Sequence, residues 1–202
     1  MAKGFSEREK DAIRERLMDA AEACWGRYGL RKTSVDQLVE MAHISKGAFY
    51  LFYPSKEHLF MDVFDRIEIR VKDEVFRMIQ SAQGSKKDIF VSVLNQMYHS
   101  VKKAPWILNI SNGDFELLVR KLPPERIAQH HHGDDDASVH FLKLLDMDSA
   151  GNIEVLSGVL RSLFLLLLHK QEIGEAQFDR VVEYLTEAIA LKLFGEGTAK
   201  ND

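Results

Sequence analysis

The sequence predicts an all-α fold, and three observations lead to this prediction. Apolar residues recur at the three- and four-residue spacing of an amphipathic helix along most of the 202 residues. No segment of useful length alternates apolar and polar residues as a strand does, and no internal repeat or glycine-rich phosphate loop occurs. Residues that cap or end helices, such as Ser6, Gly29, Ser34 and Pro54, divide the chain into successive helices.

The first helix is predicted to begin after Ser6, which forms a capping box with Glu9, and to stop at Gly29. Its apolar residues share one face: Ile13, Leu17, Ala20, Ala21, Cys24, Trp25 and Tyr28. Cys24 is the only cysteine, so an internal disulfide is excluded and a reducing compartment is favoured. A single cysteine on an apolar face is interpreted as packing rather than as a redox sensor.

Two short helices follow and have the connection length of a helix-turn-helix. Ser34 and Gln37 form a second capping box, and Ser45 caps the next helix after a corner at His43 and Ile44. Lys46 and Tyr50 then share a face of a very short helix, with a glycine between them. Because glycine destabilises a helix interior by about 1 kcal/mol relative to alanine, we expect a close approach to the backbone here, from outside or from a neighbouring helix.

A long fourth helix is predicted from Ser55, after Pro54 ends the third, to about Gly84. Further helical patterns cover 89–101, a short segment after Pro105, 115–122, 124–131, 139–145, 153–170 and 178–194. Between two of them, His130 to Asp136 contains residue types that bind metals, but adjacent side chains cannot all face one ion. This run is therefore interpreted as a solvated loop, with no metal site.

The helix-turn-helix region resembles the DNA-binding domain of TetR-type bacterial transcriptional regulators. The resemblance covers roughly residues 13–64 and is carried by Thr33-Ser34-Val35, by Gly47 and Tyr50, and by Tyr53-Pro54-Ser55-Lys56-Glu57 with Leu59. His43 stands where the family usually has glycine, but histidine tolerates positive φ, so we expect the turn to be kept. Ala48 and Leu51 stand where polar residues are common on the recognition helix.

The resemblance implies a helix-turn-helix DNA-binding domain at residues 1–58, with the helix-turn-helix at about 34–53. The fourth helix would join this three-helix domain to a C-terminal helical bundle, residues 59–202, for ligand binding and dimerisation. The residues expected at DNA are Thr33, Ser34, Ser45, Lys46, Gly47, Ala48, Tyr50, Leu51 and Lys56. Tyr50 and Lys56 are expected to anchor phosphates, whereas Lys46, Ala48 and Leu51 are expected to read bases.

The charge distribution agrees with a DNA contact near the N-terminus. The net charge of the chain is −4, but residues 1–56 contain ten Lys and Arg against eight Asp and Glu. Between Arg27 and Lys56 the count is five against two. Phosphate contact depends on the positive residues at the interface and not on the sum over the chain.

Bulky residues of the middle segment are either solid core or the lining of a pocket for an apolar or aromatic molecule. These candidates are Phe90, Met97, Tyr98, Trp106, Phe115, Leu118, Phe141 and Leu144. The last two long helices are apolar on more than one side, so two sides should be buried. The resemblance implies that one of these sides lies in a dimer interface. The dimer-interface candidates are Val159, Leu163, Leu166, Leu167, Val182, Leu185 and Ile189.

The resemblance, together with these observations, implies a bacterial, cytoplasmic transcriptional regulator. A homodimer would bind a palindromic operator in double-stranded DNA and, as a repressor, be released by a small-molecule effector. No catalytic residues, cofactor or membrane association are predicted, since no nucleophile elbow, metalloprotease signature or membrane-length apolar run occurs. The alternative is a helical small-molecule binding or enzymatic module whose N-terminal domain no longer binds DNA.

Overall fold

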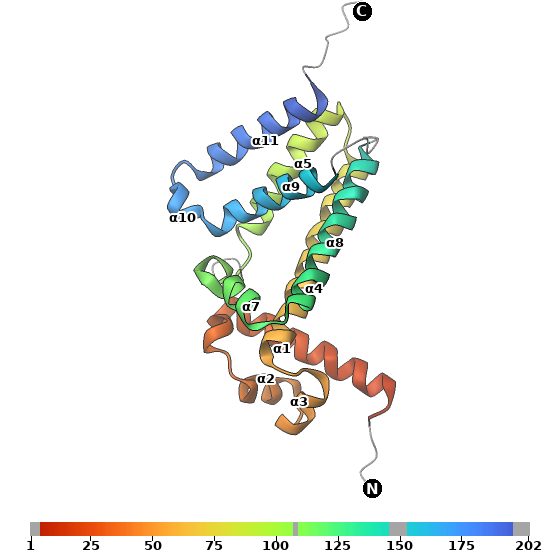
Figure 1. The fold of residues 1–202 in the computed structure, drawn as a ribbon, viewed down its shortest axis with the longest axis vertical. Coiled ribbons are helices and arrows are strands. Elements are labelled where there is room, and N and C mark those ends of the chain that lie inside the picture. Colours follow the sequence, from red (N-terminus) through yellow and green to blue (C-terminus); the bar gives the residue numbers. More distant parts are fainter. Residues whose placement is uncertain (1–4, 107–108, 146–152, 196–202) are drawn as a thin grey trace, which may run out of the picture. The chain divides into compact units, whose positions relative to one another are not determined.

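The computed structural model describes residues 5–106, 109–145 and 153–195, which form helices with no strand among them (Figure 1). The all-α prediction is therefore confirmed. The elements in chain order are α1 (Glu7–Lys32), α2 (Val35–Ala42), α3 (Lys46–Phe52), α4 (Lys56–Ser81), α5 (Lys86–Val101), the π-helical turn η1 (Ile110–Asp114), α7 (Phe115–Lys121), α8 (Pro124–Leu144), α9 (Ile153–Leu168), α10 (Lys170–Ile173) and α11 (Phe178–Phe194).

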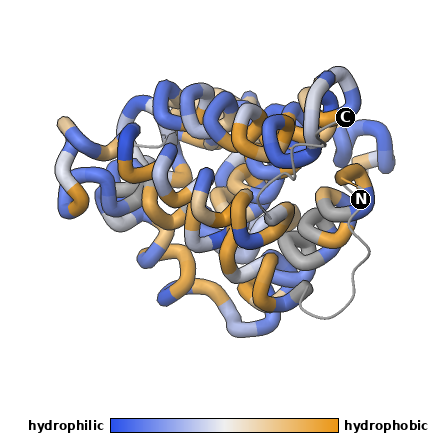
Figure 2. The backbone as a smooth tube through the Cα atoms, turned by 90° about the horizontal axis from the view of Figure 1, so that it is seen from above, coloured by the Kyte–Doolittle hydropathy of each residue, from blue (hydrophilic) through white to orange (hydrophobic). Residues whose placement is uncertain are grey.

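The amphipathic pattern that predicted these helices is visible along the backbone. Hydrophobic and hydrophilic stretches alternate along the helices in Figure 2, as expected where each helix turns one face inward and another to solvent. Among the described helices, none combines the length and the apolar content needed to cross a bilayer.

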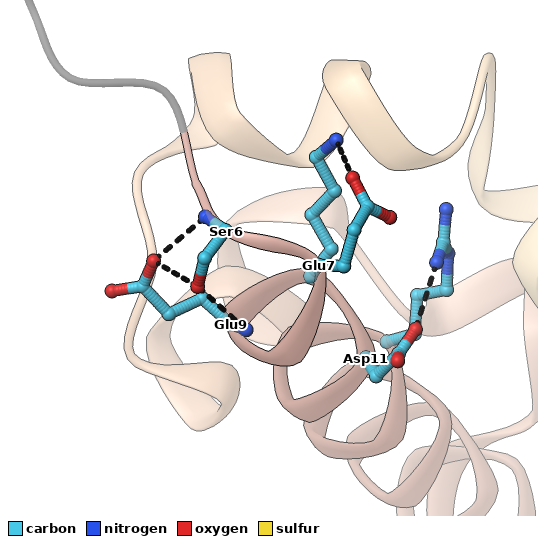
Figure 3. Close-up of polar contacts among 6 residues, drawn as sticks. Ser6, Glu7, Glu9 and Asp11 are labelled. Atoms are coloured by element: carbon cyan, nitrogen blue, oxygen red, sulfur yellow. Dashed lines mark hydrogen bonds and ion pairs between the residues drawn. The ribbon is translucent and has the colours of Figure 1, made fainter.

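The amino end of α1 is fixed by its predicted capping box. The Ser6 backbone N–H donates to Glu9 Oε2 at 2.8 Å, and the Glu9 N–H donates to Ser6 Oγ at 3.4 Å (Figure 3). Two ion pairs follow on the same helix, Lys10 with Glu7 and Arg14 with Asp11. The two bonds of the box satisfy backbone donors that have no partner within the helix, so the helix begins where the sequence predicts.

The chain divides into two compact units, and each is made of two separate segments. Unit 1 comprises residues 1–68 and 104–129, and unit 2 comprises residues 69–103 and 130–202. Helices α4 and α8 therefore contribute residues to both units. The predicted boundary at residue 58 differs from this division, because residues 104–129 group with the N-terminal helices although they are distant in sequence.

The core of unit 1 is built around aromatic rings from α1 and α4. Trp25 meets Phe60 edge-on, with ring centroids 5.3 Å apart, and Phe64 lies 6.1 Å from Trp25. Phe64 also contacts Phe115 of α7 at 5.1 Å. Aromatic rings bury large areas and prefer such tilted or edge-on pairs, so this cluster stabilises α1 against the start of α4.

Unit 2 is centred on the pair α5 and α11. Phe90 contacts Phe194 at 5.7 Å, and Tyr98 contacts Phe178 at 6.4 Å. The early residue of α5 therefore meets the late residue of α11, and the two helices are antiparallel. Phe90 also contacts Phe141 of α8 at 5.7 Å. Near one end of the pair, Lys102 forms an ion pair with Asp179.

The run from His130 to Asp136 is helical, so the prediction of a loop is wrong. These residues belong to α8, which continues from Pro124 to Leu144. His130, Phe141 and Leu145 are buried and fall on one helical face. The buried residues on either side of the run keep helical spacing, so the helix continues through it. Its polar composition alone is typical of a linker.

Candidate nucleic-acid interface

The turn between α2 and α3 has the predicted conformation. His43 adopts left-handed φ 54° and ψ 48° after the last residue of α2. The Ile44 N–H donates to the Val39 carbonyl at 3.0 Å, and the His43 N–H donates to the Glu40 carbonyl at 3.2 Å. These bonds close α2 in the manner of a Schellman motif, so histidine replaces the usual glycine without loss of the turn.

Two caps fix the beginnings of α2 and α3. Ser34 and Gln37 form the predicted capping box, and Ser45 Oγ accepts the Ala48 N–H at 3.1 Å. Arg16 of α1 adds a bond that the sequence analysis missed, from its Nε to the Ala42 carbonyl at 2.9 Å. Arg16 thus satisfies a carbonyl at the end of α2 and holds that end against α1.

Helix α3 turns one residue inward and two outward. Phe49 is fully buried, with its ring 5.2 Å from that of Tyr50 and 6.1 Å from that of Tyr53. Tyr50 is 52% exposed and Leu51 is 76% exposed. Burial raises the pKa of Tyr53, and the neighbouring Asp62 carboxylate raises it further. The buried rings therefore orient α3, and Tyr50 and Leu51 are available to a partner.

Gly47 faces open space. A Cβ placed on Gly47 would have Ser45 Oγ, at 3.9 Å, as its nearest neighbour, and no neighbouring helix among the described residues approaches it. Packing inside the described chain therefore does not explain the glycine. Its lack of a side chain leaves room for the close approach of an external surface.

Lys46 is held by an acidic residue of α2. Its Nζ lies 3.0 Å from the Asp36 carboxylate, and both side chains are exposed. Exposed pairs of this kind contribute at most about 1 kcal/mol, so the pair can open when a phosphate or a base edge competes for the ammonium. The Lys46 side chain is therefore accessible to a base, although its ammonium is paired with Asp36.

Lys56 has a structural role that the sequence analysis missed. Its Nζ donates to the Leu30 carbonyl at 2.8 Å and to the Thr33 carbonyl at 2.6 Å. The ammonium thereby satisfies carbonyls around the end of α1, where the partial charge of a helix is negative. Two of its three protons are used within the protein, and the contact of Lys56 with a phosphate stays a prediction.

Thr33 also points inward. It is 1% exposed, and its hydroxyl donates to the Gly29 carbonyl at 2.8 Å. The Thr33 hydroxyl is therefore used inside the protein, and the DNA contact of Thr33 at the N-terminus of α2 stays a prediction. Ser34 is exposed and leaves the N-terminus of α2 accessible to an anion.

A buried polar junction connects α1 with η1 inside unit 1. The carboxylate of Asp114 accepts the Trp25 indole N–H at 3.0 Å and the Leu30 backbone N–H at 2.7 Å. Gly29, with φ 78° and ψ 168°, interrupts the helical conformation of α1 just before Leu30. No spacing pattern could have predicted this junction, because its partners are more than 80 residues apart.

The eight pocket candidates are divided between the two units. Phe90, Met97, Tyr98, Phe141 and Leu144 belong to unit 2, whereas Trp106, Phe115 and Leu118 belong to unit 1.

Unit 2 contains three buried hydroxyls without a hydrogen-bond partner among the described residues, those of Tyr98, Ser157 and Thr186. Burial raises the pKa of Tyr98, so this phenol stays protonated as a donor.

The dimer candidates also separate into two groups. Leu163 and Val182 are each 3% exposed and pack inside their own chain, so they have little area to offer a partner and this prediction is corrected. Leu185 is exposed, and Val159, Leu166 and Ile189 are partly exposed. The side chain of Leu167 lies outside what the structure describes. Exposed apolar residues that were not among the candidates are Val155, Leu165, Tyr184 and Leu191.

Comparisons with known proteins agree with this geometry. Residues 17–63 match the family model described as "Bacterial regulatory proteins, tetR family". The nucleoid occlusion factor SlmA of Glaesserella parasuis serovar 5 (strain SH0165) is 22% identical over 142 residues, which cover 68% of each chain.

Two solved structures share the fold along most of the chain. Thermus thermophilus FadR, described as a TetR-family transcriptional repressor in complex with lauroyl-CoA, superposes with a TM-score of 0.68 at 18% identity, over 94% of this chain and 98% of that one. RolR in complex with resorcinol gives a TM-score of 0.58 at 16% identity, over 93% and 95% of the two chains. Residues 17–63 thus match the DNA-binding domain of TetR-family bacterial regulatory proteins, and the fold of these solved structures extends over most of the chain.

Proposed function

We propose that this protein is a repressor that binds a palindromic operator as a homodimer and is released by a small-molecule effector. The match of residues 17–63 to the TetR family model supports a DNA-binding transcriptional regulator. The observation that carries the proposal is the outward face of α3, where Gly47 is open, Tyr50 and Leu51 are exposed, and Phe49 anchors the helix from below. A helix presented in this way can enter a major groove.

Exposed apolar residues on α9 and α11 support the homodimer. Tyr184 is 79% exposed, and Val155, Leu185 and Leu191 are also exposed. Apolar side chains exposed on two helices of the same unit are typical of a surface that a partner covers. A twofold dimer would place two α3 helices on half-sites about 34 to 36 Å apart, or at a multiple of that distance.

Unit 2 is the proposed site of the effector. The aromatic residues around α5 supply an apolar surface, and the unpartnered hydroxyls of Tyr98, Ser157 and Thr186 supply hydrogen-bonding groups. A buried hydroxyl without a partner costs about 1–3 kcal/mol, which a ligand atom would recover. The proposed effector is therefore a molecule with an apolar body and at least one polar group. Lauroyl-CoA and resorcinol, bound by two proteins of this fold, both have this character.

Helix α4 is the proposed connection between effector and DNA. It is one continuous helix, with residues 56–68 in unit 1 and residues 69–81 in unit 2. At its start, Lys56 is bonded to the end of α1, so a displacement of α4 would act on the helices that hold α3. An effector that favours a conformation with another spacing of the two α3 helices would release the operator.

The test measures binding of the protein to the palindrome nearest its own gene at several salt concentrations, with random duplex as competitor. We expect a preference for the palindrome. The logarithm of the association constant should fall linearly with the logarithm of the salt concentration, because phosphate contacts release counterions. A flat salt dependence without preference would contradict the proposal and favour a helical ligand-binding module. Sedimentation equilibrium of the full chain tests the dimer, which a monomer at DNA-binding concentrations would exclude.

A further inference from the structure

The exposed apolar ridge on α3 indicates which chemical group of DNA this protein reads. The ridge consists of Gly47, Ala48 and Leu51, which lie on one side of the helix because residues three and four positions apart are neighbours. Leu51 is 76% exposed, and the site of a Gly47 Cβ has no neighbour closer than 3.9 Å. Gly47 is exposed as well, whereas Ala48 is half-buried.

The other apolar side chains of α3 are already engaged. Phe49 is buried beneath the helix. Phe52 lies against Phe5, with ring centroids 6.0 Å apart, and under the guanidinium of Arg14 at 5.7 Å. Leu51 is therefore the large apolar side chain that α3 presents outward.

The polar side chains of α3 leave little capacity for hydrogen-bonded readout of bases. Its seven residues include no Arg, Asn, Gln, Asp or Glu, the side chains that bind base edges in pairs of hydrogen bonds or accept from cytosine. Lys46 is paired with Asp36 at 3.0 Å. Tyr50 has one hydroxyl, which suits a phosphate oxygen.

The major groove contains one apolar group that differs between base pairs, the C5-methyl of thymine. We infer that Leu51, with Ala48 and Gly47 beside it, reads thymine C5-methyl groups and is a specificity-determining residue of α3. This inference rests on the proposed DNA-binding function and names the group that the recognition helix selects.

The test replaces thymine by deoxyuridine, which keeps base pairing and removes only the methyl group. The starting duplex is the best sequence that the full protein selects from a random library. Each thymine of one half-site is replaced in turn, and the affinity ratio of the thymine to the deoxyuridine duplex is measured. We expect a ratio of about four at one or two positions, which corresponds to the burial of one methyl group.

Variants assign the effect to the side chain. Leu51→Ala should bring the ratio at those positions close to one, and Leu51→Val should give an intermediate ratio, so the test does not depend on tight binding by the alanine variant. Because Leu51 is largely exposed, these substitutions leave the core intact. The matched control is Ile69→Ala, which shortens an exposed aliphatic residue of α4 and should leave the ratio at four.

The outcomes separate this inference from the function on which it rests. An unchanged ratio in Leu51→Ala overturns the inference. So does a selected duplex in which no thymine is sensitive to loss of its methyl group, although such a protein still binds DNA with sequence preference. Failure to select any sequence over random duplex overturns the proposed function as well.

Discussion

The carboxylate Oδ2 of Asp114 lies 3.0 Å from the indole nitrogen of Trp25 and accepts its N–H. The same oxygen accepts the Leu30 N–H at 2.7 Å, where Gly29 interrupts α1. One buried oxygen thus satisfies two donors that water cannot reach. This junction joins η1 to the helix against which α2 packs, so it sets the position of the helix-turn-helix within unit 1.

Replacing Asp114 by alanine should destabilise unit 1 by about 3 kcal/mol, because two buried donors lose their acceptor. Asp114→Asn, which keeps an oxygen acceptor of similar shape, should cost less. Both tryptophans of the chain, Trp25 and Trp106, belong to unit 1, so denaturant unfolding followed by tryptophan fluorescence reports on this unit. Equal midpoints for Asp114→Ala and the unmodified protein would show that the junction contributes nothing to stability.

Gly29→Ala should destabilise the protein by about 2 kcal/mol. Its φ of 78° is unfavourable for a residue with a Cβ, and that atom would lie 3.1 Å from both Asn109 Oδ1 and Asp114 Oδ2. Gly158→Ala in α9 is the matched control, because a Cβ there has no neighbour within 4 Å. The control should be neutral or stabilising by up to about 1 kcal/mol. Thermal unfolding followed by circular dichroism should give the lowest midpoint for Gly29→Ala. The midpoint of Gly158→Ala should equal or exceed that of the unmodified protein.

Features that depend on a few consecutive residues could be predicted from the sequence. The capping boxes of Ser6 and Ser34, the Ser45 cap and the turn at His43 are local, since side chain and backbone partners lie within five residues. The inward position of Phe49 follows in the same way from helical spacing and burial.

Features that depend on distant partners could not be predicted. The Asp114 junction joins residues 84 and 89 positions apart, and Lys56 reaches carbonyls 23 and 26 positions away. For Leu163 and Val182, periodicity shows that a helix has two apolar faces but not which of the two meets its own chain. In α8, the polar composition of residues 130–136 is typical of a loop, whereas the helical spacing of apolar residues on either side favours one continuous helix.

Tyr50 and Lys46 should affect DNA binding in different ways. Tyr50→Phe keeps the ring contact with Phe49 and removes only the hydroxyl, so affinity should fall by a similar factor for all duplexes. Lys46→Ala should mainly reduce the preference for the selected duplex over single-base variants. Competition assays with a panel of such variants measure both effects. The same loss of preference in the two proteins would contradict this division of roles.

Lys56→Ala should reduce stability and DNA affinity together. The substitution leaves the Leu30 and Thr33 carbonyls without the ammonium, which should cost about 1–3 kcal/mol in unfolding free energy. Lys46→Ala is the matched control, because its exposed pair with Asp36 contributes at most about 1 kcal/mol. If Lys56 acted on phosphate alone, both variants would unfold at the same denaturant concentration.

Asp179 should give unit 2 a small dependence on pH. The hydrogen bond from Lys102, at 2.7 and 2.9 Å to the two carboxylate oxygens, and the charge of that lysine lower the pKa of Asp179 below its usual value of 3.8. Since the folded-state pKa is the lower one, the stabilisation is complete above the unfolded pKa and is lost as pH falls through the folded pKa. Asp179→Asn should therefore unfold more easily than the unmodified protein at pH 7, with a difference that shrinks below pH 4. The exposure of the carboxylate limits the difference at pH 7 to less than about 1 kcal/mol. Thermal unfolding of both proteins between pH 3 and 7 measures this difference in stability. Lys102→Met is expected to show the same trend. A constant difference across that range would mean that the pair does not stabilise the α5–α11 contact through its charge.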